Sequence, residues 1–140
     1  MFALSFEIHN TRRRMQTSKP TESELEILHL LWEMGPSTVR SVNDSLKTRR
    51  EVGYTTTLKL MQIMHEKGLV NRIEDGRTHI YTASVTQDAT QSVLLQQFVD
   101  AAFRGSAMKM VMQALGNHEA SAEELDEIKA LIAQIEENKP

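Results

Sequence analysis

The sequence lacks cysteine altogether and is poor in aromatic residues, which make up 5% of its 140 positions. Without thiols it can form neither a disulfide nor a thiolate metal site, so we expect a reducing, cytoplasmic compartment. It also lacks an apolar run near the roughly 18 residues of a membrane span, a signal-peptide pattern and a Gly-rich phosphate loop, and its five histidines are scattered. We therefore expect no membrane segment, no cofactor, no metal site and no enzyme active site.

Acidic and basic residues are unevenly divided along the chain, whose net charge is −3. Residues 1–81 hold 12 Lys and Arg against 10 Asp and Glu, whereas residues 82–140 hold 4 against 9. Because phosphate binding depends on local rather than total charge, the amino-terminal part is the one suited to a nucleic acid. The change in charge places a domain boundary near Ala83.

Residues 1–19 show no sustained periodicity and are predicted to be a disordered basic arm, or an extension upstream of a natural start at Met15. A helix is predicted next, because Thr21 and Glu24 form a capping box and an apolar helical pattern runs to Gly35-Pro36. Its predicted inward residues are Leu25, Ile27, Leu28, Leu30, Leu31, Trp32 and Met34.

A second helix is predicted after Ser37, whose hydroxyl can cap it, and its inward residues are Val39, Val42 and Leu46. Two polar residues near its start, Arg40 and Ser41, then lie outside, where the first helix of a helix-turn-helix crosses the phosphate backbone. Arg49 and Arg50 follow in the connection to the next helix. We expect all four to contact the DNA backbone.

A third helix is predicted to open on three threonines after Tyr54 and to stop at Gly68. Its inward residues are predicted to be Thr57, Leu60, Met61 and Met64. Its outward residues, expected to contact base edges, are Thr55, Thr56, Lys59 and Gln62. Lysine pairs with guanine and glutamine with adenine, while the threonine methyl packs against the thymine methyl.

A β-hairpin is predicted to follow, with strands at Leu69–Ile73 and Thr78–Tyr81 and with Asp75-Gly76 in its turn. Arg72 at its base and Arg77 at its tip are expected to contact the DNA backbone. Three helices followed by a basic hairpin are typical of a winged helix-turn-helix. The predicted fold class is therefore mainly α with a small β-hairpin wing, and residues 20–83 form the DNA-binding domain.

Residues 84–140 are predicted to form three further helices with apolar faces, the last of them opened by a second capping box at Ser121 and Glu124. One small winged-helix core cannot cover three such faces, so we expect a helical dimerisation region and a homodimer. The residues expected in the dimer interface are Phe98, Ala102, Phe103, Met108, Val111, Met112, Leu115, Leu125, Ile128, Leu131, Ile132 and Ile135.

The motifs ESELEILHLLWEMGPSTV, GYTTTLKLMQIMHEKGLV and GRTHIYTA resemble the penicillinase-repressor (BlaI/MecI/CopY) family, from about Thr21 to Glu137. The resemblance implies a homodimeric winged-helix repressor that occupies a dyad-symmetric operator in double-stranded DNA. Two positions depart from the family pattern. Many members have an arginine where this chain has Ile63, so the resemblance implies one DNA contact fewer here. Many also have an aliphatic residue where this chain has Thr57, so the resemblance implies a softer core here.

The resemblance also implies a release step. Better-known members leave DNA when a protease that depends on a membrane sensor cuts an Asn-Phe bond in the dimerisation region. Gln113-Ala114 stands opposite that bond in this chain, so a regulatory protease is an expected partner but the cleavage site is not preserved. Copper-responsive relatives use cysteine pairs, which this chain lacks, and the inducing signal stays open.

Two other functions fit the same motifs. A winged helix can serve purely as a protein-interaction module, in which case the protein would show no salt-dependent affinity for DNA. A ligand-sensing regulator of the multiple-antibiotic-resistance type would instead gain thermal stability from a small molecule.

Overall fold

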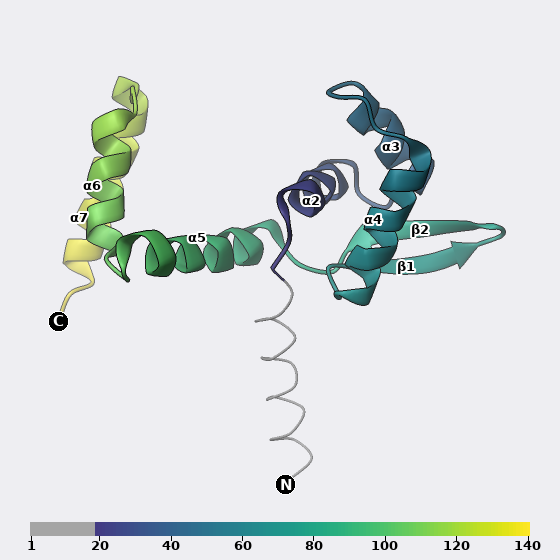
Figure 1. Cartoon of the computed structure of the whole chain (residues 1–140). Helices are drawn as coiled ribbons and strands as arrows, with labels where there is room; N and C mark the ends of the chain where they lie inside the picture. The colour runs from purple at the N-terminus through teal and green to yellow at the C-terminus, as the bar shows by residue number, and fades with distance from the viewer. Residues whose placement is uncertain (1–18) are drawn as a thin grey trace, which may run out of the picture. The chain divides into compact units, whose positions relative to one another are not determined.

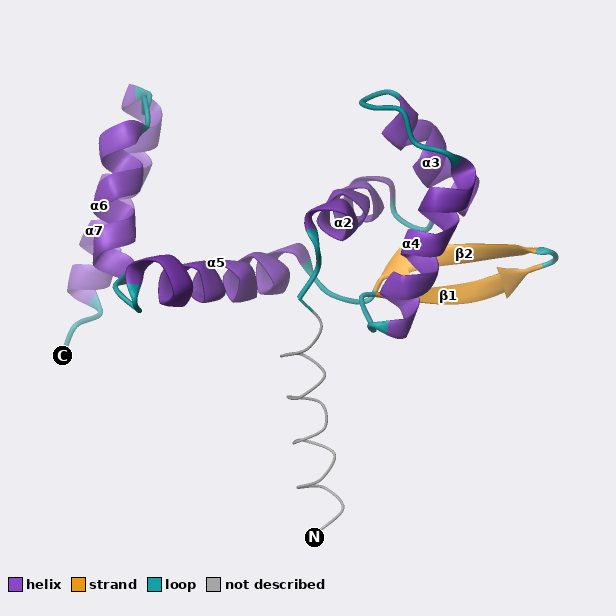
Figure 2. Cartoon of the chain, in the orientation of Figure 1, coloured by secondary structure: helices purple, strands orange, loops and turns teal. Residues whose placement is uncertain are grey.

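The computed structural model describes residues 19–140, so the predicted basic arm, apart from Lys19, lies outside the described residues. The described chain contains six helices and one two-stranded hairpin (Figure 1, Figure 2), which confirms the predicted fold class. It divides into two compact units, one up to Leu94 and one from Leu95 to Pro140. The division falls within α5 (Gln87–Phe103), and the domain bounds expected from the sequence stay a prediction.

The first described helix, α2 (Glu22–Met34), begins with the predicted reciprocal capping box. The Thr21 amide donates to Glu24 Oε1 and the Glu24 amide donates to Thr21 Oγ1, each at 3.2 Å. The prediction that Met34 faces inward is wrong, because its side chain is 40% exposed at the edge of the core, where Ser45 Oγ donates to its sulfur. The buried residues that α2 gives to the core are Ile27, Leu28, Leu30 and Leu31.

The second described helix, α3 (Val39–Lys47), is capped by Thr38, whose hydroxyl accepts from the Ser41 amide at 3.1 Å. The prediction that Ser37 caps this helix is wrong. Ser37 instead forms an isolated antiparallel bridge with Tyr81: its amide donates to the Tyr81 carbonyl at 3.0 Å and the Tyr81 amide donates back at 2.8 Å. A residue whose backbone is paired in this way cannot also take the capping position, so the next hydroxyl residue serves.

The third helix, α4 (Tyr54–Glu66), lies between α3 and the hairpin (Figure 1). Thr57, Met61 and Met64 are buried and Leu60 packs against the core, as predicted. The predicted outward residues, Thr55, Thr56, Lys59 and Gln62, are all exposed. The helical period alone therefore predicted which side of this helix is available to a partner.

The hairpin pairs β1 (Val70–Asp75) with β2 (Thr78–Ala83) in antiparallel register (Figure 2). The predicted turn position is one residue early, because Asp75 pairs with Thr78 and ends β1, which leaves Gly76 and Arg77 as the two-residue loop. Gly76 has a φ of 68°, and a glycine at the first loop position is what such a turn requires. Arg77 is therefore exposed at the tip, as predicted.

A buried ion pair joins the start of α2 to the end of α4. Lys67 Nζ donates to Glu24 Oε1 at 2.6 Å and to Oε2 at 3.0 Å, and the Glu24 side chain is only 2% exposed. Burial by itself would raise the pKa of the Glu24 carboxyl, but hydrogen bonds from Lys67 and Thr21 outweigh it and hold the pKa below its usual value. The charged form of Glu24 is therefore favoured in the folded protein.

Lowering the pH is expected to show how much the Glu24–Lys67 ion pair contributes to the stability of the fold. A carboxyl whose folded pKa is depressed stabilises the fold above its unfolded pKa of about 4.3, and that stability is lost as the pH falls through the folded pKa. Glu24→Gln should lower the free energy of unfolding at pH 7 by about 2 kcal/mol, and the loss is no larger because Lys67 is partly exposed. Below pH 7, the free energy of unfolding of this variant should depend less steeply on pH than that of the wild type. Denaturant titrations between pH 7 and pH 2.5, followed by circular dichroism, measure both effects.

The control is Glu26→Gln, which removes the exposed pair between Glu26 Oε1 and Arg50 Nε at 3.2 Å. An exposed pair contributes about 0.5 kcal/mol or less, so this variant should behave almost as the wild type. Equal losses in the two variants would contradict the role given to the buried pair.

The second unit contains the end of α5, then α6 (Ala107–Asn117) and α7 (Ala122–Glu137). The predicted capping box at α7 is only half formed: Ser121 Oγ accepts from the Glu124 amide, but the Glu124 carboxylate binds His118 Nε2 and the Ser121 hydroxyl. Neither α6 nor α7 contains a buried residue. Among the described helices, none is both long and apolar enough to cross a membrane.

Candidate nucleic-acid interface

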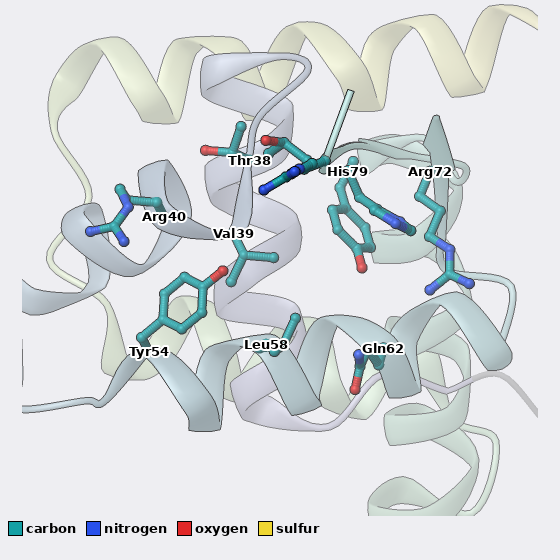
Figure 3. Close-up of a pocket in the computed structure, with 11 residues that line it drawn as sticks. Thr38, Val39, Arg40, Tyr54, Leu58, Gln62, Arg72 and His79 are labelled. Carbon is teal, nitrogen blue, oxygen red and sulfur yellow. The ribbon is translucent and has the colours of Figure 1, made fainter. Parts of the chain in front are cut away.

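A groove of about 490 Å³ lies between the start of α3, the exposed side of α4 and the hairpin (Figure 3). The side chains that line it come from all three elements, and none of them is a carboxylate. Its lining residues are Thr38, Val39, Arg40, Tyr54, Leu58, Gln62, Arg72, Arg77, Thr78, His79 and Tyr81. Three arginines without a lining carboxylate make a positive groove, which suits a phosphate backbone.

The register of the hairpin explains how its side chains reach the groove. Residues that pair across the strands share a face, and every second pair lies on the same face. Arg72 pairs with Tyr81 and Glu74 pairs with His79, so all four lie on the face that Tyr81, which is 1% exposed, buries toward the core. Arg72 and His79 are thereby directed toward α4, while Glu74 Oε1 lies 3.7 Å from His79 Nε2.

Arg40 and Tyr54 form a cation–π pair at one end of the groove (Figure 3), with the guanidinium carbon 5.6 Å from the ring centroid. The contact joins the first turn of α3 to the first residue of α4. Such a pair restricts the guanidinium without neutralising its charge. Arg40 is therefore held in place and still available to an anion, and Arg72 extends from β1 at the other end of the groove, near Gln62.

The remaining predicted contact residues lie outside the groove. Thr55, Thr56 and Lys59 are exposed on α4 next to it. Arg49 and Arg50 are exposed in the connection between α3 and α4, where Arg50 is engaged by Glu26. The structure thus brings Arg40, Gln62, Arg72 and Arg77 together in the groove and leaves the other predicted contact residues outside it. Ser41 is exposed on α3, and its hydroxyl accepts a hydrogen bond from Thr38.

The sequence interpretation missed Tyr54 and His79 as groove residues. Tyr54 was treated only as part of a family motif, because its contact with Arg40 depends on how α3 packs against α4. His79 was counted only among the five scattered histidines, for which a surface or half-buried position is the default. Its Nδ1 is buried without a hydrogen-bond partner, and no pattern local to the strand predicts this.

The predicted dimerisation residues form an apolar surface on the second unit. Most of them are exposed: Met108 is 69% exposed, Met112 65% and Leu131 56%. On α7, Leu125, Ile128, Leu131, Ile132 and Ile135 recur at helical spacing and fall on one stripe, and on α6 Met108, Val111, Met112 and Leu115 do the same. Phe98 and Phe103 of α5 meet edge to face at 5.8 Å, and Ala102 is exposed between them.

A family model described as the penicillinase repressor matches residues 20–134, which is most of the chain. The chain belongs to the penicillinase repressor family. The matched region contains the whole groove and all of the apolar surface except Ile135, and the predicted resemblance is confirmed.

Individual relatives agree with this membership. The chain is 31% identical to the transcriptional regulator BlaI of Mycobacterium tuberculosis over 112 residues, covering 77% of this chain and 78% of that protein. It is 22% identical to the penicillinase repressor of Bacillus licheniformis over 119 residues, covering 85% of this chain and 93% of that protein. Outside this family, the chain is similar to the solved structure of a homodimeric winged helix-turn-helix DNA-binding domain from Mycobacterium bovis, a possible ArsR-family regulator, with a TM-score of 0.48 at 21% identity, covering 67% of this chain and 82% of that one.

Proposed function

We propose that this member of the penicillinase repressor family is a homodimeric transcriptional repressor that occupies a dyad-symmetric DNA operator. The observation that carries the proposal is the positive groove between α3, α4 and the hairpin, with polar side chains exposed on α4 beside it. A helix of this diameter fits the major groove of DNA, and a basic hairpin beside it reaches the neighbouring backbone.

The contacts divide into two classes under this proposal. Thr55, Thr56, Lys59 and Gln62 contact base edges and provide sequence preference. Arginines around the groove and in the α3–α4 connection, with Ser41, contact phosphates and provide salt-dependent affinity. The proposed backbone contacts are Arg40, Ser41, Arg49, Arg50, Arg72 and Arg77.

Two alanine variants are expected to separate these classes. Lys59→Ala should weaken binding to the preferred duplex by about 1–3 kcal/mol and leave random duplexes little affected, because it removes a base contact. Arg77→Ala should weaken binding to both duplexes alike and reduce the slope of log affinity against log salt by about 1. The measurement is a fluorescence-anisotropy titration at several salt concentrations, with a duplex enriched from a random library and an unselected duplex.

Lys109→Ala on α6 is the matched control, since it removes an exposed cation outside the proposed interface. It should leave both affinities and the salt slope unchanged. Identical behaviour of Lys59→Ala and Arg77→Ala on the two duplexes would contradict the division of contacts. An absence of any salt-dependent binding by the wild type would refute the proposed function and favour a protein-interaction module.

The apolar surface of the second unit supports the homodimer in this proposal. A second copy of the chain would cover the stripes of α6 and α7, which the chain itself leaves exposed. Release from the operator would follow from any event that separates the two copies. Cleavage by a regulatory protease fits this scheme, and a cut at Gln113-Ala114 would require α6 to open first, because both residues lie inside that helix.

A further inference from the structure

A buried polar link holds the start of α4 against α3. Asn43, on α3, is 2% exposed and Thr57, on α4, is fully buried. Asn43 Nδ2 donates to the Val52 carbonyl at 3.2 Å and to Thr57 Oγ1 at 2.8 Å. The expectation that Thr57 only softens the core is wrong, because its hydroxyl is the acceptor in a contact between two helices.

The direction of each hydrogen bond in this link is determined by chemistry. An amide NH₂ can only donate, so the Thr57 hydroxyl accepts from Asn43 and turns its own proton to the Gly53 carbonyl, 3.4 Å away. The reversed amide orientation would set the Asn43 carbonyl against the Val52 carbonyl, two acceptors without a proton between them. The link therefore has one satisfied arrangement.

Both carbonyls in the link belong to the residues that lead into α4. Gly53 is the N-cap of the helix and has no side chain with which to cap it. The Asn43 side chain does not cap the free amides of α4; it donates to the Val52 carbonyl just before the helix and holds the helix from the side through Thr57. Together these contacts restrict both the axial position of α4 and its rotation about its own axis.

The rotation of α4 decides where its exposed side chains lie. A helix with side chains has a radius of about 5–6 Å, so a rotation of about 20° moves the side-chain surface by about 2 Å. The usable range of a hydrogen bond is only about 0.5 Å. Apolar contacts in the core are not directional, so they distinguish neighbouring rotations of α4 less sharply than the Asn43–Thr57 hydrogen bond does.

We propose that Asn43 and Thr57 are positioning residues for sequence recognition, which hold α4 in the rotation that presents its exposed polar side chains to base edges. This rests on the proposed DNA-binding function. A buried polar pair adds little net stability, and its role here is to select one geometry among several of similar energy. Neither residue touches DNA.

The test compares full-length variants by the ratio of affinity for the library-selected duplex to affinity for an unselected duplex. Thr57→Val removes the acceptor without changing the shape, and Asn43→Leu with Thr57→Val removes both partners. The ratio should fall about tenfold or more, the size expected when one base contact is lost, while affinity for the unselected duplex stays the same. Thr57→Ser, which keeps the hydroxyl, should retain the ratio.

Met64→Leu is the control for a buried, volume-conserving change on α4 that leaves the link intact. It should not alter the ratio even if it lowers the melting temperature. A merely structural role would lower both affinities together with the folded fraction, which circular dichroism reports, and that result would overturn the proposal. An unchanged ratio in both Thr57→Val and the double variant would overturn it too. A wild type that prefers no duplex would instead defeat the proposed function itself.

Discussion

Replacing Ile128 and Ile132 with aspartate is expected to leave the protein monomeric and to lower its affinity for the selected operator about 100-fold or more. The two residues lie one turn apart on the apolar stripe of α7. Two charges buried without partners in an interface would cost several kcal/mol, of the order of the association energy itself. Light scattering at micromolar concentration measures the assembly, and an anisotropy titration measures the affinity.

The chain offers a matched control on the same helix. Ala130→Asp with Ala133→Asp adds the same two carboxylates on the opposite side of α7, where both positions are exposed. This variant should remain a dimer, even though replacing alanine costs more helix propensity than replacing isoleucine. A wild type that is monomeric at micromolar concentration would contradict the dimer proposal outright.

Inserting about 5 bp between the two half-sites of the operator is expected to reduce affinity to that of a single half-site. Such an insertion turns one half-site by about half a turn of the duplex, so the two wings of one dimer no longer face both sites. An insertion of about 10 bp returns both half-sites to the same face of the duplex and should recover part of the affinity. A gel-shift series with spacers lengthened one base pair at a time measures the period.

A loss of affinity that does not follow the helical period of the spacer would indicate flexibility between the DNA-binding and dimerisation segments of the protein. Equal affinity at every spacing would mean that the dimer does not bind two half-sites together. The isolated half-site is the reference, and the monomeric Ile128→Asp, Ile132→Asp variant should bind all spacings with that same affinity.

Local sequence signals predicted the helices and the hairpin well. The capping box at Thr21 and Glu24 involves residues three apart, and the exposed side of α4 follows from a period of 3.6 residues, so both lie within the range of local chemistry. The glycine in the hairpin turn gave the element correctly and its position to within one residue. Signals of this kind depend only on neighbours along the chain.

Contacts between residues distant in sequence were not predictable in this way. Glu24 was identified as a cap, but its partner Lys67 lies 43 residues further on. Ser37 was predicted to cap a helix, and its pairing with Tyr81 was not predictable because it depends on where the hairpin folds back. The groove has the same origin: α3, α4 and the hairpin bring Arg40, Tyr54 and His79 to one groove, and no periodicity within any one of these elements carries that information.

The single tryptophan, Trp32 on α2, contacts the segment that connects the hairpin to α5. Trp32 Nε1 donates to the Val85 carbonyl at 2.9 Å, and Val85 directly precedes Thr86, whose hydroxyl accepts from the Ala89 amide in the first turn of α5. The emission of an indole shifts to longer wavelength when water replaces a partner of this kind. The tryptophan fluorescence of the unlabelled protein therefore reports on the connection between β2 and α5. A red shift of the emission would show in real time that this connection had separated from α2.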